Sequence, residues 1–225
     1  MQNRYDAILF DLDGTLLDTI ADLTDSVNHA LRLHGLPART AAEVRRFIGN
    51  GASRLMELSV PGGLADPLFE TCLASFQDHY AQNRQKTRPY PGIMELLARL
   101  SGQGFRLAIV SNKPDAAVQA LSREWFGALI DIAIGESKGI PKKPDPATVY
   151  MALEAMRSAP GRCAYIGDSE VDVQTARNAR ISFIGVTWGY RDRETLIRSG
   201  AERLTDTPGG LAGLLGGHPE RCCEE

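Results

Sequence analysis

Two aspartates, Asp11 and Asp13, lie two residues apart directly after the apolar run 7–10. The β-propensity of that run predicts a buried strand, and Gly14 then ends the pattern. Side chains two apart in an extended segment point the same way, so both carboxylates should project into one small volume. Their repulsion favours a cation, and Mg²⁺ suits them because it prefers oxygen ligands. The alternative at this point is a plain turn, in which Asp and Gly are also common.

Other side chains that could do chemistry lie at similar places. Ser111 and Asn112 follow the apolar run 105–110, and Asp168 follows the run 163–166, with Asp172 one helical turn later. Lys142 and Lys143 lie in the loop before the helix that Asp145-Pro146 opens. If the runs are parallel strands, their carboxyl ends meet at one edge of a sheet and these groups converge. Carboxylates with a lysine suit a metal-assisted reaction on a phosphate, in which one carboxylate becomes an aspartyl phosphate.

The predicted elements that must position these groups change along the chain. Residues from about 19 to 86 show helical spacing without a clear strand, whereas strands and helices alternate from about residue 89 onward. The alternation predicts an α/β fold with a Rossmann-like parallel sheet covered by helices on both faces. We therefore predict a core of residues 1–18 and 87–225, and an inserted helical cap at 19–86 that acts as a lid.

The individual elements are predicted as follows. Strands are expected at 7–10, 105–110, 130–134, 163–166 and 182–186, and helices at about 20–34, 40–47, 52–58, 67–85, 92–101, 115–124, 146–157, 170–179, 192–199 and 208–215. Thr40 is expected to cap its helix, and Pro144 or Pro146 to lie in a first helical turn.

Composition narrows the classes of partner. The 225 residues are 43% hydrophobic and 24% charged, with a formal net charge of −3. These values are typical of a globular protein and argue against nucleic acid as a main partner, and no signal peptide or membrane span is apparent. Cys72 and Cys163 lie in apolar patterns and are expected in the core, whereas Cys222 and Cys223 form an incidental pair in a polar tail. We expect a cytoplasmic monomer or homodimer.

Four of these segments together resemble the haloacid dehalogenase superfamily in its phosphatase branch. They are Asp11-Leu12-Asp13-Gly14-Thr15, Ser111 at a strand end, Lys143-Pro144-Asp145-Pro146, and Gly167-Asp168-Ser169-Glu170-Val171-Asp172. They occur in the order that the superfamily shows, and the helical insertion after the first is similar to the superfamily's four-helix cap.

The resemblance implies a mechanism. Asp11 would be the nucleophile that accepts the phosphoryl group, and Asp13 would protonate the leaving oxygen and then activate water. Mg²⁺ would be held by the carboxylate of Asp11, the backbone carbonyl of Asp13 and the carboxylate of Asp168. The substrate would be a small phosphorylated metabolite.

Supporting roles follow from the same resemblance. Ser111 and the backbone near Leu12 and Asn112 would hold the phosphoryl oxygens. Lys143 would steady the charge on the nucleophile and the phosphate. Asp172 would support the metal shell or Lys143, and Thr15 would help orient the second aspartate.

The reaction is less sharply defined than the site. Asp13 favours phosphoryl chemistry, because dehalogenases of the superfamily lack an aspartate there. Hydrolysis comes first, with a sugar-phosphate mutase of the β-phosphoglucomutase type and a non-catalytic phosphate-binding protein as alternatives. The segment Gly49-Asn50-Gly51 resembles the cap loop of phosphoglycolate phosphatases, which implies substrate contacts, although it also suits a simple turn between helices.

Overall fold

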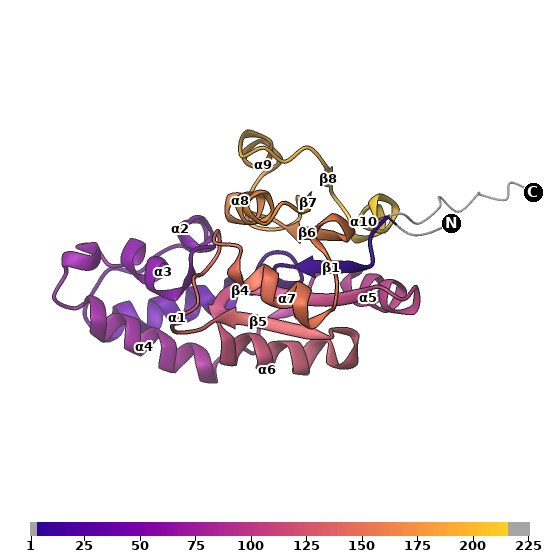
Figure 1. Cartoon of the computed structure of the whole chain (residues 1–225). Helices are drawn as coiled ribbons and strands as arrows, with labels where there is room; N and C mark the ends of the chain where they lie inside the picture. Colours follow the sequence, from indigo (N-terminus) through magenta and orange to yellow (C-terminus); the bar gives the residue numbers. More distant parts are fainter. Residues whose placement is uncertain (1–3, 216–225) are drawn as a thin grey trace, which may run out of the picture.

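A six-stranded parallel sheet forms the centre of the computed structural model, which describes residues 4–215 (Figure 1). In sheet order the strands are β5 (Ile132–Glu136), β4 (Arg106–Pro114), β1 (Ala7–Phe10), β6 (Cys163–Gly167), β7 (Ser182–Val186) and β8 (Leu204–Thr205). The chain builds outward from β1 in one direction and then in the other, so β1 lies between β4 and β6. Ligands of such sheets bind beyond the carboxyl ends of the strands where the direction changes.

Alternation along β1 gives the sheet two buried faces. Ile8 and Phe10 belong to one hydrophobic cluster, and Ala7 and Leu9 to another on the opposite face. The first face is covered by α5 (Ile93–Gly102), α6 (Asp115–Trp125) and α10 (Pro208–Leu214), and the second by α7 (Ala147–Ala155) and α8 (Glu170–Ala179). The helix α9 (Arg193–Arg198) packs on α8 through a smaller cluster. The α/β fold with helices on both faces is as predicted.

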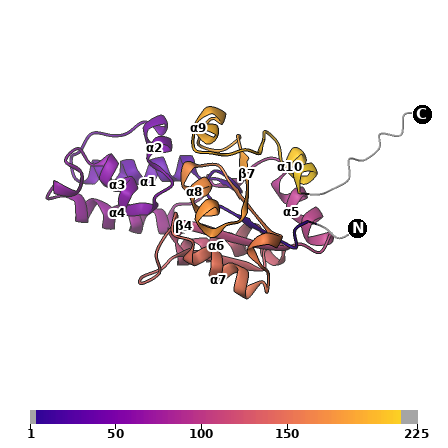
Figure 2. The same cartoon turned by 45° about the horizontal axis from the view of Figure 1, so that its top comes forward.

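A group of helices lies beyond one end of the sheet and is called the cap below (Figures 1 and 2). It comprises α1 (Ile20–Leu33), α2 (Ala41–Phe47), α3 (Gly51–Ser59) and α4 (Phe69–Gln82). These helices share a hydrophobic cluster of their own, to which the core contributes Tyr190. As predicted, Thr40 caps α2, and it does so reciprocally with Glu43 in a capping box. The cap therefore has an apolar interior separate from those of the sheet.

The two chain segments that connect cap and core pair with each other. Strand β2 (Leu17–Asp18) lies antiparallel to β3 (Arg88–Pro89), a two-stranded ribbon that the sequence did not predict. Next to it, Asp22 accepts hydrogen bonds from the backbone N–H and the hydroxyl of Thr87, at 2.6 and 2.7 Å. The entry to the cap and the exit from it are thus fastened together.

Most element bounds agree with the sequence prediction, and the differences are local. Strand β4 continues through Ser111 to Pro114 with a register shift, and β5 begins two residues later than expected. Pro146 is the N-cap of α7 and Pro144 lies before the helix, so neither is in the first turn. Cys72 and Cys163 are buried free thiols, as predicted, whereas Cys222 and Cys223 lie outside the described residues.

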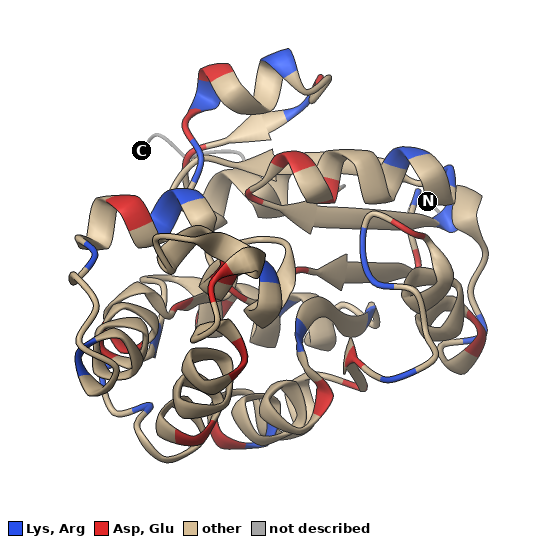
Figure 3. Ribbon diagram, turned by 90° about the vertical axis from the view of Figure 1, so that its left-hand side faces the viewer, with Lys and Arg blue, Asp and Glu red and all other residues tan. Residues whose placement is uncertain are grey.

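Acidic and basic positions are interspersed over the elements seen from the cap side (Figure 3). Within residues 4–215, no helix combines the length and the apolar character that a membrane span requires.

Candidate active site

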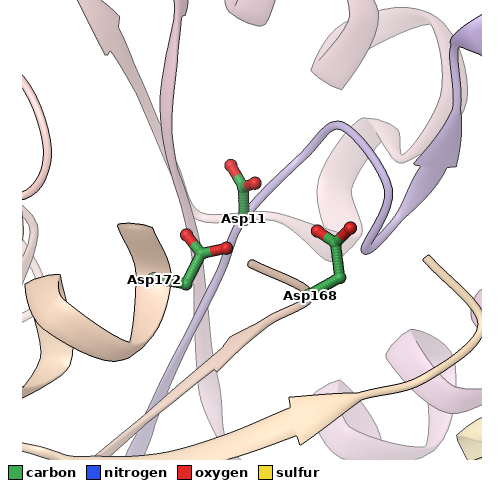
Figure 4. A group of neighbouring side chains, drawn as sticks. All are labelled: Asp11, Asp168 and Asp172. Carbon is green, nitrogen blue, oxygen red and sulfur yellow. The ribbon is translucent and has the colours of Figure 1, made fainter. Parts of the chain in front are cut away.

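Three buried carboxylates meet beyond the carboxyl ends of the central strands (Figure 4). Asp11 follows β1, Asp168 follows β6, and Asp172 lies in the first turn of α8. One carboxylate oxygen from each lies within 4.8 Å of the others. Parallel pairing of β1 with β6 brings the first two together, because Phe10 and Ile166 are register partners at the strand ends.

Lys143 supplies a buried positive charge to this cluster. Its ammonium Nζ lies 2.9 Å from Asp11 Oδ1, and it donates to Asp172 Oδ1 and to Tyr165 Oη at 2.8 and 2.9 Å. Burial by itself lowers the pKa of Lys143, but the two carboxylates raise it well above the ordinary value, so the ammonium stays protonated. The neighbouring Lys142 is instead partly exposed and pairs with Glu136. The choice of Lys143 from the sequence is consistent with this geometry.

Asp172 is held by the helix that carries it. Its Oδ2 accepts hydrogen bonds from the hydroxyl and the backbone N–H of Ser169, at 2.5 and 3.1 Å, which closes a capping box. With Lys143 on its other oxygen, the carboxylate is fully engaged. It therefore contacts Lys143, and the supporting role expected for Asp172 stays a prediction.

Asp13 points to a different partner, which the sequence did not single out. Lys113, at the end of β4, donates to both carboxylate oxygens of Asp13 at 2.8 Å. The Thr19 hydroxyl donates to Asp13 Oδ1 at 2.7 Å and lies 2.8 Å from the Tyr190 hydroxyl. The carboxylate of Asp13 is therefore fixed at the junction of cap and core. The predicted metal contact through its backbone carbonyl stays a prediction.

Thr15 donates its hydrogen bond to Asp168, whereas the expected partner was Asp13. Its hydroxyl donates to Asp168 Oδ1 at 3.1 Å, and its side chain is completely buried. The expectation that Thr15 orients Asp13 is wrong, because Thr19 makes that contact. The second oxygen of Asp168 accepts the backbone N–H of Tyr190 at 2.6 Å. A Cβ on Gly14 would come within 2.9 Å of all three Asp168 carboxyl atoms, so this approach requires glycine.

The charge balance of the site fits a divalent cation. Four carboxylates, those of Asp11, Asp13, Asp168 and Asp172, face two ammonium groups, which leaves two negative charges when all are ionised. Burial raises the pKa of Asp11 to about 7 and that of Asp168 well above its usual range. An all-oxygen donor set with this excess of charge fits a hard ion such as Mg²⁺.

A cavity of about 460 Å³ opens above the carboxylates between core and cap. Its core side includes Asp11, Asp13, Ser111, Asn112, Lys113 and Asp168, and its cap side includes Ile48, Gly49, Gly51, Leu55, Phe76 and Tyr80. The predicted residues Thr15, Asn50 and Lys143 do not line it. Most of the wall surface is apolar, and the charged groups of the core lie at the floor near the carboxylates, while Gln77, Tyr80 and Arg84 add polar groups on the cap side.

The segment Gly49-Asn50-Gly51 forms the turn between α2 and α3 and also reaches the cavity. Gly51 has a φ of +85°, and a Cβ there would lie 2.9 Å from Glu136 Oε2. The side-chain amide of Asn112 donates to the backbone oxygens of Gly49 and Lys143, at 3.0 and 2.9 Å. That amide therefore ties the cap turn to the core. The predicted phosphate contacts of Ser111 and of the backbone near Asn112 remain predictions.

Arg191 is a second tie that sequence reasoning missed. Its guanidinium pairs with Glu170 at 2.8 Å and donates to the backbone oxygens of Arg45 and Ile48, each at 2.8 Å.

Lys113 could have been found from the sequence, because it follows Ser111 by two residues and so lies on the same side of an extended chain. Neither Tyr190 nor Arg191 stands at such a spacing from a predicted site residue.

Comparison with known proteins agrees with this fold and site. The family model described as haloacid dehalogenase-like hydrolase matches residues 8–186. The chain therefore belongs to the haloacid dehalogenase-like hydrolase family.

Individual relatives show which members of the family the chain is similar to. The chain is 36% identical over 189 residues to the phosphoglycolate phosphatase of Pseudomonas putida, covering 81% of this chain and 70% of that protein. It is 34% identical over 224 residues to the phosphoglycolate phosphatase of Vibrio vulnificus, covering 95% and 96% respectively. A crystal structure from Lactobacillus delbrueckii subsp. bulgaricus superposes with a TM-score of 0.91 at 35% identity, covering 96% of this chain and all of that one.

Proposed function

We propose that this protein is a Mg²⁺-dependent phosphatase that hydrolyses a small phosphate monoester through an aspartyl phosphate on Asp11. The observation that carries the proposal is the cavity floor, where Asp11 lies beside a buried ammonium and a second carboxylate, Asp168. The similarity to phosphoglycolate phosphatases makes 2-phosphoglycolate the first candidate substrate.

The first half-reaction uses Asp11 as nucleophile. Its carboxylate oxygen attacks phosphorus, and the bond between phosphorus and the ester oxygen breaks. Lys143 Nζ, 2.9 Å from Asp11 Oδ1, holds the carboxylate in place and offsets negative charge as the dianionic phosphoryl group approaches. A divalent cation held by Asp11 and Asp168, with the backbone carbonyl of Asp13, would neutralise phosphoryl charge when bound.

Asp13 moves the protons in both halves. In the first, its carboxyl group gives a proton to the leaving ester oxygen, so that an alcohol departs. In the second, its carboxylate takes a proton from water as the water oxygen attacks phosphorus, which breaks the bond to Asp11 and releases inorganic phosphate. Hydrogen bonds from Lys113 and Thr19 hold this carboxylate at one position beside the cavity.

The cap acts as a lid in this proposal. The division predicted from the sequence is part of the proposal, with residues 19–86 assigned to the cap domain and residues 1–18 and 87–225 to the core. A lid that closes over the cavity excludes bulk water during phosphoryl transfer, and reopening releases product. The direct contacts of the Gly49–Gly51 turn with Asn112 support a closed position of the cap over the carboxylates.

Phosphate release from 2-phosphoglycolate by the purified protein tests the function. We expect turnover with Mg²⁺, none with excess chelator, and none from Asp11→Asn. Isomerisation of glucose 1-phosphate with a bisphosphate activator would favour the mutase instead. Binding of phosphate without turnover of any ester would favour a non-catalytic protein.

We also propose a cytoplasmic monomer or homodimer. Light scattering after size-exclusion chromatography and cell fractionation test these two points.

A further inference from the structure

Lys113 is buried, and within the described residues Asp13 is its only charged partner. Its side chain is 4% exposed, and its ammonium contacts both oxygens of Asp13 at 2.8 Å. An ammonium has three N–H donors, and the two contacts with Asp13 use no more than two of them. Because Lys113 also lines the cavity, the third donor, which otherwise has only the Tyr80 side chain beside it, can serve a bound molecule.

Tyr80 places a hydroxyl beside this ammonium from the opposite wall. It belongs to the cap helix α4, is 6% exposed and lines the same cavity. Lys113 Nζ lies 4.6 Å from the centre of the Tyr80 ring. The Tyr80 hydroxyl is buried, and the Lys113 ammonium lies beside it without a hydrogen bond of ordinary geometry in residues 4–215. A buried polar group that is so weakly satisfied costs free energy, and a ligand that accepts its hydrogen bond removes that cost.

Other cationic side chains on the cavity wall are placed differently. Arg191 is taken up by Glu170 and by backbone oxygens of the cap. Arg84 is only half-buried, at the cap edge beyond α4. Apolar side chains such as Leu55 and Phe76 line the same cavity. Gln77 and Ser111 also line it with neutral donors, so Lys113 and Tyr80 are distinguished by a buried charge with a hydroxyl beside it.

We propose that Lys113 Nζ and Tyr80 Oη together bind a carboxylate of the substrate, on the side of the leaving group. This inference rests on the proposed phosphatase function and specifies its substrate class. Asp13 faces the leaving ester oxygen, and Lys113 is in direct contact with Asp13, so a carboxylate one carbon from that oxygen reaches the ammonium. The favoured substrates are phosphate monoesters of 2-hydroxy acids, of which 2-phosphoglycolate is the smallest.

A matched pair of substrates isolates this recognition. Propyl phosphate has nearly the shape of 2-phosphoglycolate without its carboxylate, and the ratio of their kcat/KM values measures the preference for the charged group. Effects of Lys113 on Asp13 act on both substrates and cancel in this ratio. We expect the wild-type ratio to exceed about tenfold, as for one charge-assisted hydrogen bond in a site that excludes water.

The variants are Lys113→Met and Tyr80→Phe, with Lys138→Met as control on an exposed loop. We expect the ratio to fall about tenfold or more in Lys113→Met and several-fold in Tyr80→Phe, and to stay unchanged in the control. Tyr80→Phe removes one oxygen only, so a fall in the ratio reports the loss of the contact between that hydroxyl and the carboxylate. If Lys113→Met does not fold by circular dichroism, Tyr80→Phe decides.

Two results would overturn the inference alone. They are a wild-type ratio near one, and a ratio that stays unchanged in the folded variants. The absence of Mg²⁺-dependent hydrolysis of these esters and of an aryl phosphate by the wild type would overturn the proposed function, and this inference with it.

Discussion

Thr19 donates a 2.7 Å hydrogen bond to Asp13 although the two residues lie on opposite sides of the connection between core and cap. Thr19 is the residue before α1, and its hydroxyl makes no capping bond to that helix. The same hydroxyl contacts Tyr190 Oη at 2.8 Å. The position of the proton-transferring carboxylate is thus linked to the first residue of the cap.

Removing that hydroxyl should slow the chemistry more than it weakens binding. We expect Thr19→Val to lower kcat about tenfold, with a smaller change in KM, because one buried hydrogen bond to a carboxylate is lost. Thr19→Ser keeps the hydroxyl and should retain most of the activity. Steady-state kinetics with 2-phosphoglycolate measure both, and equal kcat values for the two variants would contradict a positioning role for the hydroxyl.

The contribution of Asp11 to the stability of the metal-free protein should fall as the pH rises from about 4 to 7. Burial raises the pKa of Asp11 to about 7, well above the ordinary value of an aspartate. Between these values the folded state keeps a proton that the unfolded chain has lost, so the free energy of unfolding falls with increasing pH. Asp11→Asn lacks this titration and should gain stability relative to the wild type between pH 5 and pH 7.5. Urea unfolding in chelator measures the difference, and an equal offset at both pH values would refute the assignment.

Asp168→Asn should weaken the metal site. The amide carries no charge, and one of the three clustered carboxylates is lost. We expect the Mg²⁺ concentration for half-maximal activity to rise about tenfold or more. Asp78→Asn makes the same chemical change at an exposed position of α4 and serves as the control. A Mg²⁺ titration of activity distinguishes the two, and the same midpoint in both would argue against Asp168 as a ligand.

Lys143→Met should destabilise the metal-free protein by about 3 kcal/mol, because it leaves buried carboxylates without their cation. The ammonium contacts Asp11 and Asp172 at 2.9 and 2.8 Å, so removing one of these acids should recover part of the loss. The double variant Lys143→Met/Asp172→Asn is therefore expected to be more stable than Lys143→Met. Chemical unfolding at pH 7 tests the order, and a double variant of equal or lower stability would contradict it.

The sequence predicted the parts of the site that depend on strand ends. Asp11 and Asp168 follow strands, and Ser111 comes directly after the apolar run of β4, so parallel pairing brings the three together. Lys113 could have been placed near the site in the same way, but its pairing with Asp13 could not be inferred from the sequence. Asp13 is 100 positions away, and the pairing depends on the register of β1 against β4.

The contacts of two threonines show a second limit of prediction from the sequence. Thr15 and Thr19 are four residues apart and chemically identical, so the conformation of the turn between them decides which carboxylate each one reaches. Gly14, with a φ of +85°, sets that turn. The strands β2 and β3 were missed for a different reason, since two residues are too few to show a period.

That short ribbon has a consequence for how the cap can be exchanged. Leu17 pairs with Pro89 and Asp18 with Arg88, so the two ends of the insertion leave the core side by side. A module whose ends meet can be replaced by another, or by a tight turn, without displacing the strands that carry the catalytic groups. Substrate specificity can therefore change by replacement of the whole cap, while Asp11, Lys143 and Asp168 keep their positions in the core.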